Sequence, residues 1–226
     1  MRVLAIDTAL AACSAAVLDT ERGAIIAGES LPMMRGHAEA LMPLVARVME
    51  RSGKAFTELD RVVVTTGPGS FTGLRVGISA ARGIALAANK PAVGLSTLWA
   101  YAAPHLNADT KAPVVCAIDA RHEHVYLQVL SPDGQALSAA RLATLREAAQ
   151  AATSPAWIVG SAAQAVAAAI PKTGAAPVAV DARPAPDVAW VARVGATLPE
   201  DQAPPRPQYL QAPDAQPQHA AQLPRR

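Results

Sequence analysis

The sequence predicts an α/β protein built from two similar lobes, each with a mixed sheet. Two observations predict this class. Short apolar runs of strand length alternate with longer runs of helical period, and their order in the first half recurs in the second. Ile6-Asp7, at the end of the first run, corresponds to Ile118-Asp119 in the repeat. With 226 residues, the chain can bury a sizeable core, as one large domain or two small ones.

In the first half, three strands precede a helix, a strand, a helix and a strand. The continuous apolar run 61–66 is typical of a buried parallel strand. Leu41, Leu44 and Val48 form the apolar stripe of the first helix. Pro43 lies inside that helix and predicts a kink or a later start. The expected strands are 2–7, 13–18, 24–28, 61–66 and 92–95, and the expected helices are 37–51 and about 72–88.

The second half repeats this order. Its expected strands are 114–119, 124–130, about 136–142, 156–160 and 177–181, and its expected helices are 144–152, 161–170 and 187–197. Two lobes of this kind are typical of the duplicated ribonuclease-H-like core that actin, the sugar kinases and Hsp70 share.

The expected division gives an N-terminal lobe over 1–103 and a C-terminal lobe over 104–198, with the boundary near Pro104 and 107–113. Residues 199–226 carry seven of the chain's 19 prolines, a density that argues against regular structure. We expect an extended, partly disordered tail, with Tyr209-Leu210 docked back onto the body.

Charge and cysteine content favour an intracellular protein without a strong nucleic-acid surface of its own. The formal net charge is +2, far from the basic stripe that nucleic-acid binding usually needs. Cys13 and Cys116 lie in apolar strands, outside any metal-binding spacing, and are expected to be buried thiols. Asp7 interrupts the first apolar run, which argues against a signal peptide, and no run is long enough for a membrane helix. The expected location is the cytoplasm.

The most unusual local sequence is TTGPGSFTGLRVG at 65–77, which leaves a strand and enters a helix. It fits neither common phosphate loop, because it lacks the lysine of a Walker A loop and its third glycine comes one residue late for a dinucleotide fingerprint. A helix N-terminus still favours an anion, so a vestigial phosphate or nucleotide contact and a simple capped turn both stay open. The candidate contacts are Asp7, Gly67, Gly69, Ser70, Thr72, Gly73, Arg75 and Asp119.

An actin-type ATP site needs a glycine soon after the aspartate that ends the first strand of each lobe. Here Ala9 and Ala120 stand in the corresponding turns. A Cβ atom at those places restricts close approach to a phosphate, which argues against an independent kinase or ATPase.

The helix after the glycine-rich turn has small residues at every fourth position. Gly73, Gly77, Ala81 and Ala85 form a smooth ridge, and glycine inside a helix costs about 0.8–1 kcal/mol relative to alanine. The ridge therefore indicates close approach of another element. Internal packing and a subunit interface are both open, and we favour the interface.

Side-chain constellations for catalysis or metal binding are otherwise missing from the sequence. His122 and His124 share one side of a strand, but surface histidines explain them more simply than a metal site. Neither a G-x-S-x-G elbow nor a paired base for Ser70 occurs.

Together these segments resemble the bacterial TsaB (YeaZ) family of tRNA threonylcarbamoyladenosine biosynthesis subunits. The matching pieces are LAIDTALAACSAAVL, HAEALMPLV, VVTTGPGSFTGLRVGISAARGIALA, VGLSTL, IDARHEHVY and PPRPQYLQ, and they cover nearly the whole chain apart from its far end. Gln211 departs from the family's usual Tyr-Leu-Arg ending.

The resemblance implies a non-catalytic subunit that activates the modification of the tRNA adenosine beside the anticodon. It implies a heterodimer with the paralogue TsaD, a further partner in the ATPase TsaE, and tRNA contact through the complex. It also implies ATP and metal on the partners, with none bound independently by this chain, and self-association through the same helical face. The expected interface residues are His37, Leu41, Met42, Val45, Met49, Gly73, Gly77, Ala81 and Ala85.

Two other functions are compatible with the sequence. Asp7, Asp119 and the glycine-rich turn would suit an actin-fold phosphotransferase or ATPase. A metal-dependent peptidase is the other, because relatives of this family were grouped with such proteases.

Overall fold

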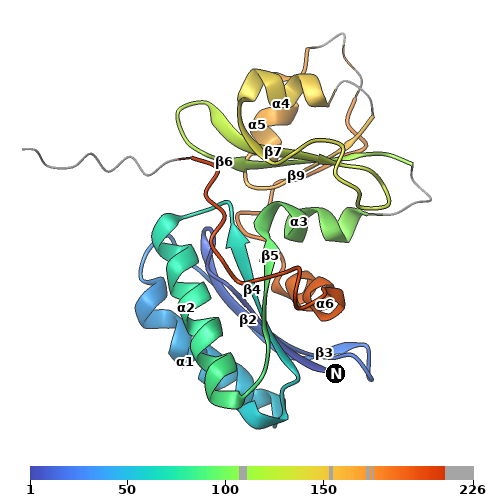
Figure 1. Ribbon diagram of the computed structural model, residues 1–226. Helices are drawn as coiled ribbons and strands as arrows, with labels where there is room; N and C mark the ends of the chain where they lie inside the picture. Colours follow the sequence, from blue (N-terminus) through green and yellow to red (C-terminus); the bar gives the residue numbers. More distant parts are fainter. Residues whose placement is uncertain (107–110, 153–154, 172–173, 175, 212–226) are drawn as a thin grey trace, which may run out of the picture.

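The first of two sheets in the computed structural model holds the first five strands (Figure 1). The structure describes residues 1–106, 111–152, 155–171, 174 and 176–211. In this sheet β1 pairs antiparallel with β2 and parallel with β4, so the sheet is mixed. The strands, in the order β3-β2-β1-β4-β5, are β1 (Arg2–Asp7), β2 (Ala12–Asp19), β3 (Ala24–Pro32), β4 (Arg61–Gly67) and β5 (Ala92–Ser96).

The second sheet repeats this topology, with β6 paired antiparallel to β7 and parallel to β9. Its strands, in the order β10-β9-β6-β7-β8, are β6 (Val114–Asp119), β7 (His124–Leu130), β8 (Arg141–Thr144), β9 (Trp157–Val159) and β10 (Ala179–Asp181). The predicted class of two mixed-sheet α/β lobes is confirmed. The third strand of this sheet, expected at about 136–142, is β8, which begins later and is shorter than expected, because Ala136 forms only an isolated bridge with Leu130.

Helices cover both faces of the first sheet. α1 (His37–Ser52) and α2 (Phe71–Ala88) lie on one face, and α6 (Val188–Thr197) lies on the other (Figure 1). α1 begins at His37 and continues through Pro43, so the later start does not occur. The expected C-terminal lobe included the residues of α6, yet this helix packs on the first sheet. The lobe boundaries otherwise stay a prediction, and 107–110 lie outside the described residues.

Smaller helices complete both lobes. α3 (Thr97–Ala102), which sequence analysis did not foresee, lies between the two sheets, where Leu98 and Tyr101 pack with Ile118. The second sheet carries α4 (Leu145–Ala151) and α5 (Ala163–Ala169) on its other face. Single 3₁₀ turns are η1 (Phe56–Glu58) and η2 (Ala103–His105).

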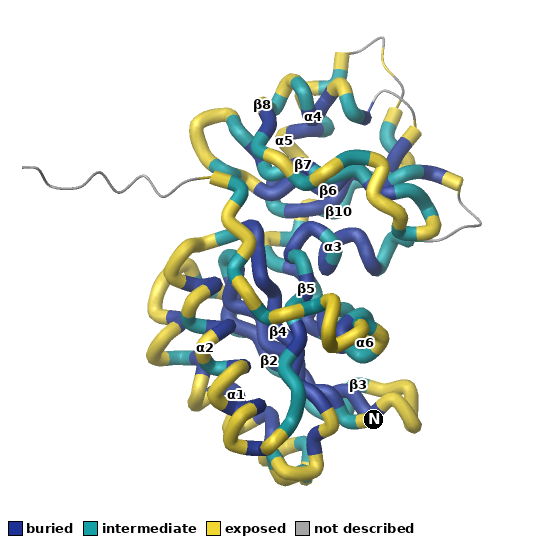
Figure 2. Tube along the Cα trace, viewed as in Figure 1, coloured by how far each residue is buried: buried dark blue, intermediate teal, exposed yellow. Residues whose placement is uncertain are grey.

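Successive side chains of β1 point to opposite faces of the first sheet, and both faces are therefore covered by helices. Leu4 and Ile6 enter the core beneath α1 and α2, whereas Val3 and Ala5 enter the core beneath α6. β1, β2 and β4 are accordingly buried, whereas the edge strand β3 is partly exposed and the outward faces of α1 and α2 are exposed (Figure 2). None of the helices in the described part of the chain has the length and apolarity needed to cross a membrane.

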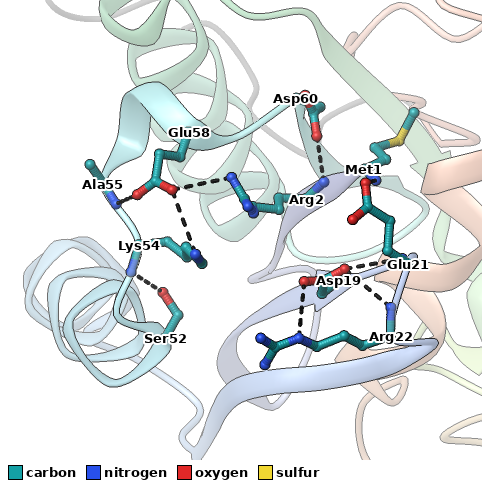
Figure 3. A network of polar contacts seen from close by, with 10 residues as sticks. All are labelled: Met1, Arg2, Asp19, Glu21, Arg22, Ser52, Lys54, Ala55, Glu58 and Asp60. Carbon is teal, nitrogen blue, oxygen red and sulfur yellow. Dashed lines mark hydrogen bonds and ion pairs between the residues drawn. The ribbon is translucent and has the colours of Figure 1, made fainter.

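The edge of the first sheet where β1 starts is held by polar contacts at the surface (Figure 3). Glu58 on η1 forms ion pairs with Arg2 at 3.2 Å and Lys54 at 3.6 Å. These groups lie at the amino end of β1, whereas Asp7 and the glycine-rich turn lie at the opposite edge. The network therefore serves local structure and takes no part in the site below.

Candidate functional site

The turn between β4 and α2 packs against the connection between β1 and β2. The N–H of Ser70 donates to the carbonyl oxygen of Ala9 at 2.8 Å, and the hydroxyl of Thr8 donates to the carbonyl oxygen of Gly73 at 2.7 Å. Ser70 is the N-cap of α2, since its hydroxyl accepts from the N–H of Gly73 at 3.3 Å. The N–H groups of Ser70 and Gly73, which could have bound a phosphate, are thus already hydrogen-bonded within the chain.

Close approach of this connection accounts for two glycines of the turn. A Cβ atom on Gly69 would overlap the carbonyl oxygen of Ala9, and one on Gly73 would overlap that of Thr8. No ligand is needed to explain either glycine. The vestigial phosphate contact proposed for this turn stays a prediction, and Thr72 lies exposed in the first turn of α2.

A C-terminal strap, residues 199–211, runs along the same edge of the first sheet. The N–H of Gly94 donates to the carbonyl oxygen of Ala203 at 2.8 Å, and the N–H of Gln208 donates to that of Thr66 at 2.7 Å. Gly67 has a φ of +112°, and a Cβ there would approach the carbonyl oxygen of Gln208. The strap crosses from α6 toward the second lobe (Figure 1), so this part of the expected tail is ordered.

The strap ends in a cluster around the start of α2. The guanidinium of Arg75 lies 3.8 Å from the ring centre of Phe71, and its Nε–H donates to the hydroxyl of Tyr209 at 3.2 Å. The Phe71 and Tyr209 rings are 5.2 Å apart, and Leu210 packs against the cluster of buried side chains around Ile118. The expected docking of Tyr209-Leu210 is confirmed, and Arg75 contacts the strap rather than extending freely toward an anion. Gln211 is exposed, and 212–226 lie outside the described residues.

The two aspartates at the strand ends have different surroundings. Asp7 is fully buried, accepts from the Thr65 hydroxyl at 2.5 Å and from the N–H of Ala9 at 3.1 Å, and has one oxygen without a partner among the described residues. Burial raises the pKa of Asp7 to about 6, against the opposing effects of these two bonds and His37. Asp119 is exposed and accepts from the N–H of Arg121 at 2.9 Å. Within the described residues, no group of three or more His, Cys, Asp or Glu side chains could hold a metal.

The small-residue ridge of α2 faces inward, which corrects its interpretation as a subunit interface. Gly77 lies against Thr8 and Val64, and the exposed fractions of Ala81 and Ala85 are 0% and 3%. The other expected interface residues are also buried, apart from Met42, which is 48% exposed: they are His37, Leu41, Val45, Met49 and Gly73. His37 contacts the carbonyl oxygen of Leu10 through Nε2 at 3.1 Å. The ridge therefore allows α2 to approach its own sheet.

An apolar hollow, called the outer groove here, lies on the exposed side of α1 and α2. Its volume is about 410 Å³, and Met42, Phe56, Ala80, Gly83, Ile84 and Ala87 line it. A Cβ on Gly83 would meet no atom within 4 Å, so this glycine borders open space. The stripe expected to form an interface, Gly73, Gly77, Ala81 and Ala85, lies on the opposite, inward side of the same helix. Ala80, Gly83 and Ala87 form the second small-residue stripe that could have indicated this groove.

Comparison with known proteins decides the family. The family model described as TsaD, tRNA N6-adenosine threonylcarbamoyltransferase, matches residues 32–216. The Escherichia coli tRNA threonylcarbamoyladenosine biosynthesis protein TsaB is 40% identical over 126 residues, 56% of this chain and 53% of the relative. The solved structure of YeaZ from Pseudomonas aeruginosa matches with a TM-score of 0.75 and 26% identity, covering 92% of this chain and 99% of that one.

The chain belongs to the TsaB (YeaZ) family. In sequence, it spans about half of the length of the curated TsaB relative. The ethanolamine utilization protein EutJ from Carboxydothermus hydrogenoformans, at a TM-score of 0.51 and 15% identity, shares the fold alone. In this TsaB-family chain the carboxyl edge of the first sheet is covered by its own strap, and the outer groove is uncovered.

Proposed function

We propose that this chain is a non-catalytic, activating subunit of the complex that makes threonylcarbamoyladenosine in tRNA. The complex transfers a threonylcarbamoyl group to N6 of the adenosine 3′ of the anticodon, in tRNAs that read codons beginning with A. The observation that carries the proposal is the covered carboxyl edge of the first sheet. The strap is bonded to Thr66 and Gly94 there, and the carbonyl oxygens of Thr8 and Ala9 lie against Gly73 and Gly69, so the start of α2 has little room for the phosphates of a nucleotide.

Membership of the TsaB family supports the same function, because the E. coli relative is named for this pathway. In the proposed complex the catalytic subunit is TsaD, and TsaE is the ATPase. ATP and metal are bound by these partners, and tRNA contacts the complex as a whole. The assembly acts in the cytoplasm, and the free chain can form a homodimer through the face that TsaD would cover.

The outer groove is the proposed contact surface for TsaD. Ala80, Gly83 and Ala87 present little more than backbone on one side of α2, so a partner helix can approach closely. Met42 supplies an adaptable apolar side chain, and Leu86 is 84% exposed on the same helix. Covering this apolar surface would contribute to association at roughly 25 cal/mol per Å² before the entropic costs of binding.

The test uses two lysine variants. One replaces an exposed apolar side chain inside the groove, and the other replaces an exposed apolar side chain outside it. Met42→Lys places a charge in the groove, whereas Leu137→Lys changes a side chain that is 61% exposed in the second lobe. Mass measurement by light scattering of each variant mixed with TsaD should show loss of the heterodimer for Met42→Lys only. Circular dichroism should show an unchanged fold for both.

A reconstituted reaction with TsaD, TsaE and an unmodified tRNA transcript tests the activity. Product formation should require this chain and should fall with Met42→Lys but not with Leu137→Lys. Normal modification in the absence of the chain would contradict the proposed function. Unchanged association of Met42→Lys would contradict the groove as the contact surface while leaving the activating role intact.

A further inference from the structure

The turn between β6 and β7 has an uncommon backbone. Arg121, His122 and Glu123 have φ angles of +67°, +50° and +60°, and none of them is glycine. A non-glycine residue in this region costs on the order of 1–3 kcal/mol, and such strain gathers at functional sites. We call these three residues the left-handed turn. Glycine would adopt the same backbone conformation at lower cost. The presence of three larger residues in the turn therefore suggests that their side chains have a role.

Hydrogen bonds hold the left-handed turn in place from both sides. The N–H of His124 donates to the carbonyl oxygen of Arg121 at 2.9 Å, and the N–H of Leu145 donates to that of Glu123 at 2.9 Å. The second bond fixes the turn to the start of α4. The side chains of the turn are thereby presented at a fixed position relative to Arg146, the next residue of the helix.

His124 is also fixed in orientation. Its Nδ1 lies 2.7 Å from the carbonyl oxygen of His122, and because a carbonyl can only accept, Nδ1 carries the hydrogen. The Nε2 atom is then the ring nitrogen left for a ligand, and it can donate a hydrogen bond to an anion only when the ring is protonated.

Two residues of the left-handed turn, His122 and Glu123, line a hollow of about 330 Å³ that is separate from the outer groove. His124, Thr144 and Arg146 also line it, and Glu123 is the one acid among the described lining residues. Arg146 forms no ion pair with the part of the chain that the structure describes, whereas nearby Glu147 is already bound to Arg141 at 3.1 Å and to the backbone of Thr144. The hollow is thus lined by two histidines and an arginine that has no ion pair among the described residues, against a single acid, and this balance of basic side chains favours an anion.

We propose that His122, His124 and Arg146 form a binding site for a phosphate group. Guanidinium and imidazole groups that line one hollow are suited to phosphate oxygens through charge-assisted hydrogen bonds. The group can belong to free phosphate or to an RNA backbone. The RNA source rests on the proposed tRNA-modifying function, while phosphate binding by the isolated chain does not.

The first experiment titrates inorganic phosphate into the isolated chain and follows the ring resonances of His122 and His124 by NMR. We expect saturable shifts in the wild type, and an affinity about tenfold or more lower in Arg146→Gln, because one charge-assisted contact is lost. Arg193→Gln is the matched control, since Arg193 is an exposed arginine on α6 that does not line the hollow. Absence of saturable shifts, or equal affinity in both variants, would overturn the site.

A second arm measures the affinity of the assembled complex for an unmodified tRNA transcript with the same two variants. A loss with Arg146→Gln alone identifies the RNA backbone as the source of the phosphate. Unchanged tRNA affinity, together with phosphate binding in the first arm, identifies a free phosphate or a small phosphate ester. Failure of the complex to assemble would count against the proposed function, and the first arm would still decide the site.

Discussion

Thr65 donates its hydroxyl hydrogen to Asp7 across the ends of two neighbouring strands, at 2.5 Å. The second oxygen of the Asp7 carboxyl group is buried and has no partner among the described residues. Burial is the largest influence on this group and raises its pKa from 3.8 to about 6, so ionisation of Asp7 opposes folding.

Asp7 should therefore make the protein less stable as the pH rises from about 4 to about 6. Its folded pKa lies above the unfolded value, so its stabilising contribution is complete below pH 3.8 and is lost above pH 6. The loss is on the order of 3 kcal/mol for a shift of this size. Asp7→Asn should remove it, so the free energy of unfolding of the variant relative to wild type should rise over this pH range.

Urea unfolding at pH 4 and pH 7 measures this difference. Comparing the two proteins at each pH cancels the opposite contribution of surface acids with lowered pKa values, such as Glu29 and Glu58. An equal difference at both pH values would show that Asp7 has the same pKa in the folded and unfolded states.

Two glycines of α2 should respond differently to replacement by alanine. Gly77→Ala puts a Cβ against Thr8, whereas Gly83→Ala puts one into open space. Both gain about 1 kcal/mol of helix propensity, but overpacking at Gly77 costs about 1–3 kcal/mol. In thermal or urea unfolding, Gly83→Ala should therefore be more stable than wild type, and Gly77→Ala should be less stable than Gly83→Ala. Equal stabilisation of both variants would mean that the inner ridge is not tightly packed.

These glycines also show what the sequence could and could not predict. The period of α2 and its cap at Ser70 are local signals, so the helix was expected within a residue of its observed start. The inward face depends on Thr8, which is distant in sequence and has no local signature in the helix. A stripe of small residues allows close packing, whether against the chain itself or against a partner. The inner stripe was therefore expected to contact a partner subunit, although it packs against the chain's own connection between β1 and β2.

The strap and α3 were harder to foresee for a related reason. Prolines at 204, 205 and 207 exclude regular structure, but an extended segment can still dock through single backbone bonds such as Gln208 to Thr66. Its partners, the ends of β4 and β5, are known only after the sheet is assembled. The apolar periodicity of the strands was sufficient to predict both sheets. The bounds of the strand expected at about 136–142 were less accurate, because β8 begins only at Arg141 and Ala136 forms a single bridge before it.

Arg61 should be important for the attachment of α6 to the first sheet. Its guanidinium donates to the carbonyl oxygens of Gly195 at 2.8 Å and Leu198 at 2.7 Å, at the end of α6, and the side chain is 8% exposed. Arg61→Met leaves these carbonyls without that donor and should lower the free energy of unfolding by about 2–3 kcal/mol. Arg193→Met, which removes an exposed bond to Gly23, should change it by less than about 0.5 kcal/mol. Equal effects in urea unfolding would argue against the capping role.

Replacing His122 in the left-handed turn by glycine should make the protein more stable but weaken its binding of phosphate. His122→Gly relieves a strained φ of +50° at a cost in unfolded-chain entropy of about 0.5–1 kcal/mol, so the free energy of unfolding should rise by about 1 kcal/mol. The same change removes one nitrogen donor from the hollow and should weaken phosphate binding in the NMR titration. His122→Ala is the control, because it removes the imidazole but keeps the Cβ and therefore the strain. Both variants should bind phosphate more weakly, and only the glycine variant should be more stable. Greater stability with unchanged phosphate binding would mean that the backbone is strained there for a reason other than the imidazole of His122.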